Sequence, residues 1–473
     1  MREIDTVRSR FVGRLKEKGT YQKWVLATAL VGMFATSFPA TILTVSLGTI
    51  ADDFDASETL ITWVITAPLL ASAVALPILG KMGDLYGQRK VFVVGFALAT
   101  LTAALTGLAW SPLALIGLRT LTQMVGAATQ PTSMALIMRA FAPGDRVKAM
   151  GWWSLVGAGS PAVGLAIGGP MVEWVGWRFV FLSQAALAVV PVIVAYLILE
   201  ETPRPKVRVR FDLKGSAALT VSAATVMLAL SQSADWGWRH PAVLGSILIA
   251  PLAMWTFVRI ERQVEHPLFP LELLQRRNFL APLITQFFSG AAYQGGFVLT
   301  PLVMRSVFGW KVSAISYLML LRPLTYSLAS PIGGRLGAAG ERRAIMVGIG
   351  MLASAMALYT WGTGWGIVPV VGVALVLQGV GNGVARPSLT SSVANAVAEE
   401  DLGLASASQR MFNQIGNAFG IAILTAIYAG DQQATPFARA YGAAFLLALI
   451  AFAGAAFIRD HDRSQLIEPV AQR

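Results

Sequence analysis

Long apolar stretches recur along the whole chain and are separated by short segments rich in charged residues, Gly and Pro. A helix needs about 20 apolar residues to cross the hydrocarbon core of a bilayer. Fourteen stretches reach this length, and they cover residues 24–50, 59–80, 91–110, 113–140, 147–171, 178–199, 213–233, 242–260, 279–305, 313–334, 343–362, 366–396, 402–429 and 439–458. The pattern therefore predicts an all-α membrane protein with about fourteen transmembrane helices.

One short motif occurs twice and divides the chain into similar halves. GKMGDLYGQRK at Gly80–Lys90 aligns without a gap with GGRLGAAGERR at Gly333–Arg343. The offset of about 253 residues pairs span 2 with span 10, and parallel repeats of this kind are typical of transporter halves. The predicted units are a cytosolic basic amphipathic segment (1–23), an N-terminal six-helix bundle (24–199), a linker with two extra transmembrane helices (200–277), a C-terminal six-helix bundle (278–458) and a cytosolic tail (459–473).

The composition supports a membrane protein and excludes several other classes. Of the 473 residues, 55% are hydrophobic and 13% are charged, with a mean hydropathy of +0.62, whereas soluble domains carry about 25% charged residues. Cysteine is absent, and the three histidines, His240, His266 and His461, lie outside the apolar stretches. These residues form no metal-ligand or acid–base motif. We therefore predict that the protein is not an enzyme and binds neither a metal ion nor a cofactor.

The basic residues are distributed unevenly between the two sides of the membrane. The formal net charge is +12, yet on the side opposite the termini the Lys and Arg residues are only Arg178, Arg239, Arg305, Lys311 and Arg439. The positive-inside rule therefore places both termini in the cytoplasm, in a cytoplasmic membrane. This orientation explains most of the excess positive charge, so no nucleic-acid partner is predicted. The mostly polar residues 1–23 predict an anchor rather than a cleavable signal peptide.

The motifs resemble the major facilitator superfamily, in particular its branch of fourteen-span drug:proton antiporters. GKMGDLYGQRK is similar to the cytoplasmic signature G-x-L-a-D-r-x-G-r-k. GGPMVEWVGWRFVF, DWGWRHP and ERQVEHPLFPLELL resemble further segments of the branch, so that the likeness covers essentially the whole chain. In the signature loop, the residues that we predict to form a conformational latch are Gly80, Asp84, Gly87, Arg89 and Lys90. The alternative is a tight cytosolic turn that carries positive-inside charges.

Three spans depart from the signatures of this branch. Span 5 reads GAGSPAVGLAIGGP, in which Pro161, Gly164, Gly168 and Gly169 are predicted to allow close helix packing and a hinge. It resembles the antiporter signature G-x-x-x-G-P-x-x-G-G but replaces its Pro by Leu. Span 4 keeps Arg119, the embedded arginine of the branch. Its positions 122 and 123 are Thr-Gln, where the branch signature has Gln-Gly. Span 1 carries a Pro where the branch has an Asp that is a candidate proton carrier.

Charged residues inside the spans are all arginines. The 25 acidic residues fall in connecting segments or at span ends, whereas Arg119, Arg139, Arg322, Arg386 and Arg410 lie within spans. An arginine at the bilayer centre costs at least about 2.5–3.5 kcal/mol, so these residues need carbonyl groups, water or an anionic ligand. The predicted substrate-binding set also contains amide side chains, namely Asn413, Gln414 and Asn417 on the helical face of Arg410, and Gln286 in span 9.

These arginines lead to the hypothesis of a cationic central cavity that recognises an anionic or zwitterionic amphiphile. Structural alternatives exist for some of them, because Arg119 could bond helix carbonyls, and Arg386 and Arg139 could extend to the inner headgroups. No carboxylate or histidine lies deep in the membrane, where proton-coupled transporters usually place such groups. Carboxylate-based proton coupling therefore has no visible carrier in the sequence.

The predicted function is secondary active transport across the cytoplasmic membrane by alternating access, with export of drugs or of amphiphilic, anionic and lipid-like compounds. The expected partners are such a substrate and the membrane lipids, and the expected state is a monomer. A uniporter or an anion symporter is the alternative within transport. A receptor or scaffold built on a transporter fold is the alternative from another class, although the paired loop motifs favour transport.

Overall fold

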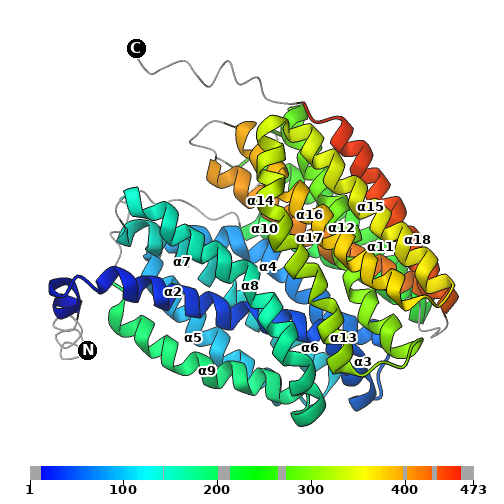
Figure 1. Ribbon diagram of the computed structural model, residues 1–473, viewed down its shortest axis with the longest axis horizontal. Coiled ribbons are helices and arrows are strands. Elements are labelled where there is room, and N and C mark those ends of the chain that lie inside the picture. Colours follow the sequence, from blue (N-terminus) through cyan, green and yellow to red (C-terminus); the bar gives the residue numbers. More distant parts are fainter. Residues whose placement is uncertain are drawn as a thin grey trace.

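The computed structural model describes residues 12–141, 143–200, 213–264, 273–397, 402–428 and 434–459, and in these ranges it is helical throughout (Figure 1). The helices are α2 (Tyr21–Ser37), α3 (Pro39–Asp53), α4 (Glu58–Tyr86), α5 (Gln88–Gly107), α6 (Pro112–Gly126), α7 (Thr129–Ala140), α8 (Pro143–Val175), α9 (Trp177–Ile198), α10 (Leu213–Trp236), α11 (Pro241–Glu261), the 3-10 turn η1 (Leu273–Gln275), α12 (Arg277–Ser306), α13 (Val312–Met319), α14 (Leu321–Ala339), α15 (Glu341–Gly364), α16 (Val368–Asn395), α17 (Leu402–Tyr428) and α18 (Ala434–Ala456).

Three of the fourteen predicted spans are each divided into two helices, namely α2–α3, α6–α7 and α13–α14. A proline stands just after each interruption: Pro39, Pro131 and Pro323. Because proline has no N–H and its ring clashes with the carbonyl four residues earlier, the ladder of hydrogen bonds stops there. Apart from the short helical segment 12–17, the seventeen helices α2–α18 thus correspond to fourteen spans, which confirms the predicted all-α membrane fold.

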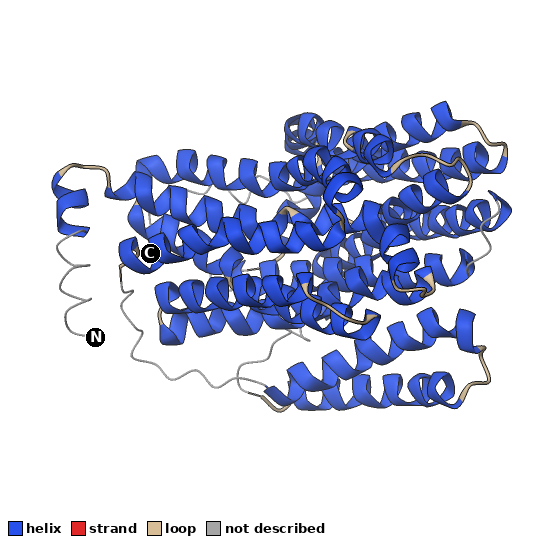
Figure 2. Ribbon diagram, turned by 90° about the horizontal axis from the view of Figure 1, so that it is seen from below, coloured by secondary structure: helices blue, strands red, loops and turns tan. Residues whose placement is uncertain are grey.

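Seven segments of the described chain are long and apolar enough on their own to cross a membrane, among them α2–α3 taken together, α9 and α18. The helices run roughly along one common direction (Figure 2). Helices α2–α9 form one half of the molecule and α12–α18 form the other. The extra pair, α10 and α11, packs together as a hairpin, and α10 also contacts α4 of the first half and α17 of the second.

An even number of spans puts the two ends of the chain on the same side. We call that side the termini end and the opposite side the far end. At the far end the halves meet near α3 and α13 (Figure 1). Among the contacts between halves there, Arg305 Nη2 pairs with Asp52 at 2.5 Å and its Nη1 donates to the Thr49 hydroxyl at 3.2 Å. The Ser313 N–H donates to Glu173 Oε1 at 2.9 Å, the Tyr428 hydroxyl donates to Glu58, and the Ser316 hydroxyl donates to the Leu165 carbonyl.

Small residues let α8 pack closely against α3 and against the second half. A Cβ atom added at Gly164 would lie 2.2 Å from the Phe38 carbonyl oxygen, and one added at Gly168 would lie 2.4 Å from Ile42. Gly169 faces α13, where an added Cβ would lie 2.5 Å from the Ser316 Cβ. Helix α8 continues without interruption through Pro161, so the hinge at this residue stays a prediction.

Candidate functional site

Two arginines of the second half lie close together on neighbouring helices. Arg410 follows the start of α17 by eight residues and Arg386 precedes the end of α16 by nine, which is about 12–14 Å from the termini end in both cases. Arg386 Nη2 donates to Asn413 Oδ1 at 3.3 Å, and Arg410 Nη1 donates to Gln130 Oε1 on α7 at 3.0 Å.

Amide side chains continue this site across the interface between the halves. Gln414 Nε2 donates to the Ser72 hydroxyl of α4 at 3.3 Å, and the amides of Asn413, Gln414 and Asn417 lie within hydrogen-bond reach of one another. The backbone of α12 comes close at Gly290, where an added Cβ would lie 2.8 Å from Asn417 Oδ1. The structure thus brings together five of the predicted binding residues: Arg386, Arg410, Asn413, Gln414 and Asn417.

No ion pair compensates these arginines among the residues that the structure describes. The described pairs are Lys16–Glu200, Arg178–Asp53 and Arg305–Asp52. Arg410 nevertheless remains exposed although it lies well inside a span. The amide oxygens of Asn413 and Gln130 accept hydrogen bonds from these two guanidinium groups. The arginine pair, Arg386 and Arg410, therefore places positive charge beside the interface between the halves, with no acidic partner among the described residues.

Arg322 lies apart from the arginine pair, in the interior of the second half. Its side chain is 8% exposed, and its guanidinium carbon lies 4.1 Å from the ring centroid of Tyr293 and 3.3 Å from that of Phe297. Nη1 donates to the Tyr293 carbonyl at 3.3 Å. Gln378 donates to the same carbonyl at 2.7 Å. Aromatic faces and a carbonyl thus solvate Arg322 in place of water.

Arg119 and Gln286 occupy two further separate positions. Arg119 is 2% exposed within the first half, with its guanidinium 5.9 Å from the Phe181 ring centroid, and its Nε and Nη1 atoms have no hydrogen-bond partner in the described structure. Gln286 is 1% exposed in the second half. Arg119 and Arg322 are therefore packed in the interiors of the two halves, and Gln286 is buried on α12 one turn before Gly290, which faces Asn413 and Asn417. The binding role of the eight residues stays a prediction.

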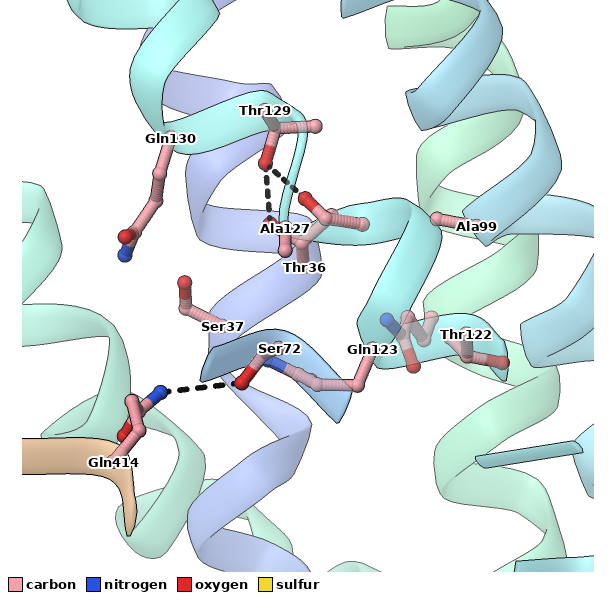
Figure 3. Close-up of a pocket in the computed structure, with 12 residues that line it drawn as sticks. Thr36, Ser37, Ser72, Ala99, Thr122, Gln123, Ala127, Thr129, Gln130 and Gln414 are labelled. Carbon is pink, nitrogen blue, oxygen red and sulfur yellow. Dashed lines mark hydrogen bonds between the residues drawn. The ribbon is translucent and has the colours of Figure 1, made fainter. Parts of the chain in front are cut away.

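A pocket that the sequence did not reveal adjoins the arginine pair from the first half (Figure 3). Its volume is about 60 Å³, and its lining consists of Thr36, Ser37, Ser72, Ala99, Thr122, Gln123, Gly126, Ala127, Thr129, Gln130, Gln184 and Gln414. Figure 3 shows Thr36 and Thr129 side by side, with 3.2 Å between their hydroxyl oxygens. The usable signal was the two polar pairs Thr122–Gln123 and Thr129–Gln130 inside an apolar span, the second directly before a proline.

The signature loop between α4 and α5 is tied to its own half. Gly87 has φ +96° at the turn, a conformation that favours glycine. Arg89 is buried, donates to the Tyr196 carbonyl of α9 at 2.7 Å and lies over the ring of the same residue. Lys90 is exposed. Gly80 and the Asp84 side chain lie outside the described part of the structure, so the latch stays a prediction.

The fold and this site together define a polytopic membrane transporter, with two helical halves around a polar cavity. The family model of the Major Facilitator Superfamily matches residues 29–321 and 282–472. The chain belongs to this superfamily. It is therefore a secondary transporter of the cell membrane and not an enzyme, and the predicted family is confirmed.

Related proteins of known name extend over most of the chain. The Tetracenomycin C resistance and export protein of Streptomyces glaucescens is 29% identical over 85% of this chain and 75% of its own length. The Multidrug transporter protein MdtP of Bacillus subtilis is 28% identical over 87% and 76%. The Puromycin resistance protein pur8 of Streptomyces alboniger is 29% identical over 89% and 86%. These similarities agree with the predicted resemblance to the drug-efflux branch.

Solved transporter structures share the fold at low sequence identity. A bacterial homolog of the human lysosomal transporter Spinster, in an inward-facing and unoccupied conformation, superimposes with a TM-score of 0.68 at 14% identity, over 93% of this chain and 98% of that one. A peptide transporter POT in complex with sulfate gives a TM-score of 0.68 at 16% identity, over 92% and 95%. These similarities establish the arrangement of helices alone.

Proposed function

We propose that this transporter exports amphiphilic compounds that carry an anionic group, and that Arg386 and Arg410 bind this group between the two halves. The observation that carries the proposal is the accessible arginine pair, which has no acidic partner in the described structure. Hydrogen bonds between a guanidinium group and a carboxylate are charge-assisted, and such bonds are stronger than neutral ones. The named relatives, which resist or export antibiotics, support export of an amphiphile.

Alternating access supplies the transport step in this proposal. With the termini end in the cytosol, as the positive-inside rule predicts, the arginine pair is reached from the cytosol and the far end is closed. Substrate binding joins α16 and α17 to α4 and α7 of the other half. The far-end contacts then separate and the substrate leaves on the outer side. The signature loop, with Arg89 held by Tyr196, is the proposed latch for this movement.

A matched pair of probes tests the anion site. N-dodecanoyl-leucine carries a carboxylate, and its methyl ester does not. In proteoliposomes that contain the full-length protein, we expect the carboxylate probe to be transported at least about tenfold faster than the ester, because charged hydrogen bonds contribute about 1.5–3 kcal/mol each. In the Arg410→Gln variant this ratio should fall to about two or less.

Arg139→Gln is the control for that variant, because Arg139 is an exposed arginine near the termini end of α7 and forms no part of the arginine pair. The ratio should stay at the wild-type value in this control. Transport of both probes at equal rates by the wild-type protein would contradict the proposed substrate class.

A second candidate, uniport or anion symport, is favoured by Pro39, which stands where the resembling branch carries an acidic residue. A proton-coupled exporter and a transporter without proton coupling differ in how their substrate flux responds to a pH gradient. An imposed gradient of one unit should change the flux of a proton-coupled exporter and leave a uniporter unaffected.

A further inference from the structure

The pocket beside the arginine pair has a lining that is polar but carries no charge. Nine of its twelve lining residues have hydroxyl or amide side chains, and the other three are Ala99, Gly126 and Ala127. Its volume of about 60 Å³ has room for about four to six waters, at about 10–15 Å³ each, or for a chemical group of similar size. The pocket therefore fits a small functional group of a larger molecule.

The pocket lies where two spans of the first half are interrupted. Thr36 is two residues before the break between α2 and α3, and Thr129 directly follows the break between α6 and α7. Their hydroxyl oxygens lie 3.2 Å apart, so the two broken spans meet at this pocket (Figure 3). Interrupted helices are a recurring way in which transporters build substrate sites inside the membrane.

The lining threonines and Gln184 offer hydrogen-bond acceptors, beside the amide donors of Gln123 and Gln130. Thr36, Thr122 and Thr129 each reach a carbonyl of their own chain at 2.8–3.0 Å, so their hydroxyl protons are occupied and their oxygen lone pairs remain available. Gln184 Nε2 donates to the Ala35 carbonyl at 2.9 Å, whereas the buried Gln184 Oε1 has no partner in the described structure. Gln184 is only 3% exposed. A buried acceptor without a partner costs about 1–3 kcal/mol, so this pocket favours a ligand that donates a hydrogen bond.

The surroundings select a donor that is uncharged. Gln130 lines the pocket and accepts from the Arg410 guanidinium at 3.0 Å, which places a positive charge beside the pocket and disfavours an ammonium group. An anion would face the lone pairs of the threonine oxygens and of Gln184 Oε1, so it is better placed at the arginines themselves. A hydroxyl or a primary amide meets both conditions.

We infer that this pocket is a subsite for a neutral hydrogen-bond donor of the substrate, a hydroxyl or a primary amide, placed next to the anionic group that the arginine pair binds. The inference rests on the proposed function and adds to it a second recognition element. Substrates of this class carry the neutral donor a few bonds from the anion. Binding of both groups at once connects α2, α4, α6 and α7 of one half with α16 and α17 of the other.

The test uses two probes that differ only at the group assigned to the pocket. N-dodecanoyl-asparagine and N-dodecanoyl-leucine share the carboxylate and the acyl chain, and their side chains have nearly the same shape, but only the asparagine side chain donates hydrogen bonds. In proteoliposomes with the full-length protein, we expect the asparagine probe to be preferred about tenfold, as judged by the ratio of initial fluxes.

Variants of the pocket should remove this preference. Thr36→Val and Gln123→Met keep the approximate shape of each side chain and remove a polar group from the lining, so each should lower the flux ratio to about two or less. Thr100→Val is the matched control: Thr100 is also half-buried and also bonds the carbonyl four residues earlier, at 2.8 Å, but it does not line the pocket. The ratio should remain about ten in this control.

The possible results separate this inference from the proposed function. Equal fluxes of the two probes in the wild-type protein would mean that the pocket holds water only, and would overturn the subsite while leaving the anion site intact. An unchanged ratio in both pocket variants would also overturn it. Poor folding of a variant lowers both fluxes in proportion and leaves their ratio unaffected, so the ratio reports the pocket of the folded fraction. Failure of the wild-type protein to transport either probe would overturn the proposed function and the subsite together.

Discussion

The two ends of the molecule join the halves with different chemistry. At the far end the groups are complementary, with Asp52 paired with Arg305 and the Glu58 carboxylate accepting from Tyr428. Toward the termini end, the described bonds between the halves join Arg410 to Gln130 and Gln414 to Ser72, and the arginine pair has no acidic partner among the residues that the structure describes. The far end thus joins the halves by opposite charges, whereas the described bonds at the other site join them through amide and hydroxyl groups, which leaves the arginines free for the anion that we propose.

Close packing adds to the closure of the far end. Because Gly169 of α8 has no side chain, Ser316 of α13 packs directly against its backbone. A buried contact of this kind is sensitive to added volume. The site toward the termini end has long amide and guanidinium side chains instead, which can rearrange around a ligand. The comparison predicts that changes at the far end alter the movement of the halves, and that changes at the other site alter the choice of substrate.

The largest effect is expected from a crosslink across the far end. Because the chain has no cysteine, Asp52→Cys with Arg305→Cys gives two unique thiols that a short bis-methanethiosulfonate reagent can join. Transport of N-dodecanoyl-leucine should fall by more than about tenfold and return after reduction, since the far end cannot open. The crosslinked protein should still bind the probe in an equilibrium binding assay, because the arginine pair stays accessible. Unchanged flux after complete crosslinking would show that the halves do not separate at this end.

An intermediate effect is expected from added volume at the contact between the halves. Gly169→Val should destabilise the closed far end by about 1–3 kcal/mol, which corresponds to about fivefold to a hundredfold in the equilibrium between closed and open forms. The alkylation rate of a single cysteine introduced at Thr49, which accepts a hydrogen bond from Arg305 of the other half, measures the shift and should rise accordingly. Gly159→Val is the control on the same helix, because an added Cβ at Gly159 meets no atom within 4 Å. Equal rates in the two variants would contradict the role of Gly169.

The smallest effect is expected from the ion pair itself. The side chains of Arg305 and Asp52 are 32% and 72% exposed, and exposed pairs contribute about 0–1 kcal/mol. Asp52→Asn should therefore raise the same alkylation rate by about fivefold or less, and 1 M salt should reduce the difference from the wild-type protein. A change as large as that caused by Gly169→Val would mean that charge, rather than packing, closes the far end.

The sequence predicted much of the fold and one part of the site. The fourteen apolar stretches follow from the length of a membrane span, and the spacing of Arg410, Asn413, Gln414 and Asn417 already placed these residues on one helical face. Periodicity within one helix cannot tell which neighbouring helix that face meets. The approach of Gln130 to Arg410, and of Ser72 to Gln414, therefore became known only from the structure.

The buried arginines show the same limit. Arg322 and Arg410 are both intramembrane arginines by sequence, but one is enclosed by Tyr293 and Phe297 while the other is open to water. The difference depends on rings contributed by α12, which lies earlier in the chain. The prolines after the three helix breaks were visible in the sequence, whereas the pocket between two of the breaks requires that α2 and α7 lie side by side.

The sequence by itself predicted the all-helical membrane fold, a repeated motif that divides the chain into two halves, and arginines without acidic residues inside the spans, because hydrophobic length, repetition and charge are local properties of a chain. Only the tertiary structure decided which arginines share a cavity, which are packed against rings, and that a neutral pocket adjoins the arginine pair. These features arise from contacts between residues that are hundreds of positions apart, such as the 280 that separate Gln130 from Arg410. Packing of whole helices, rather than the pattern within any one of them, brings such residues together.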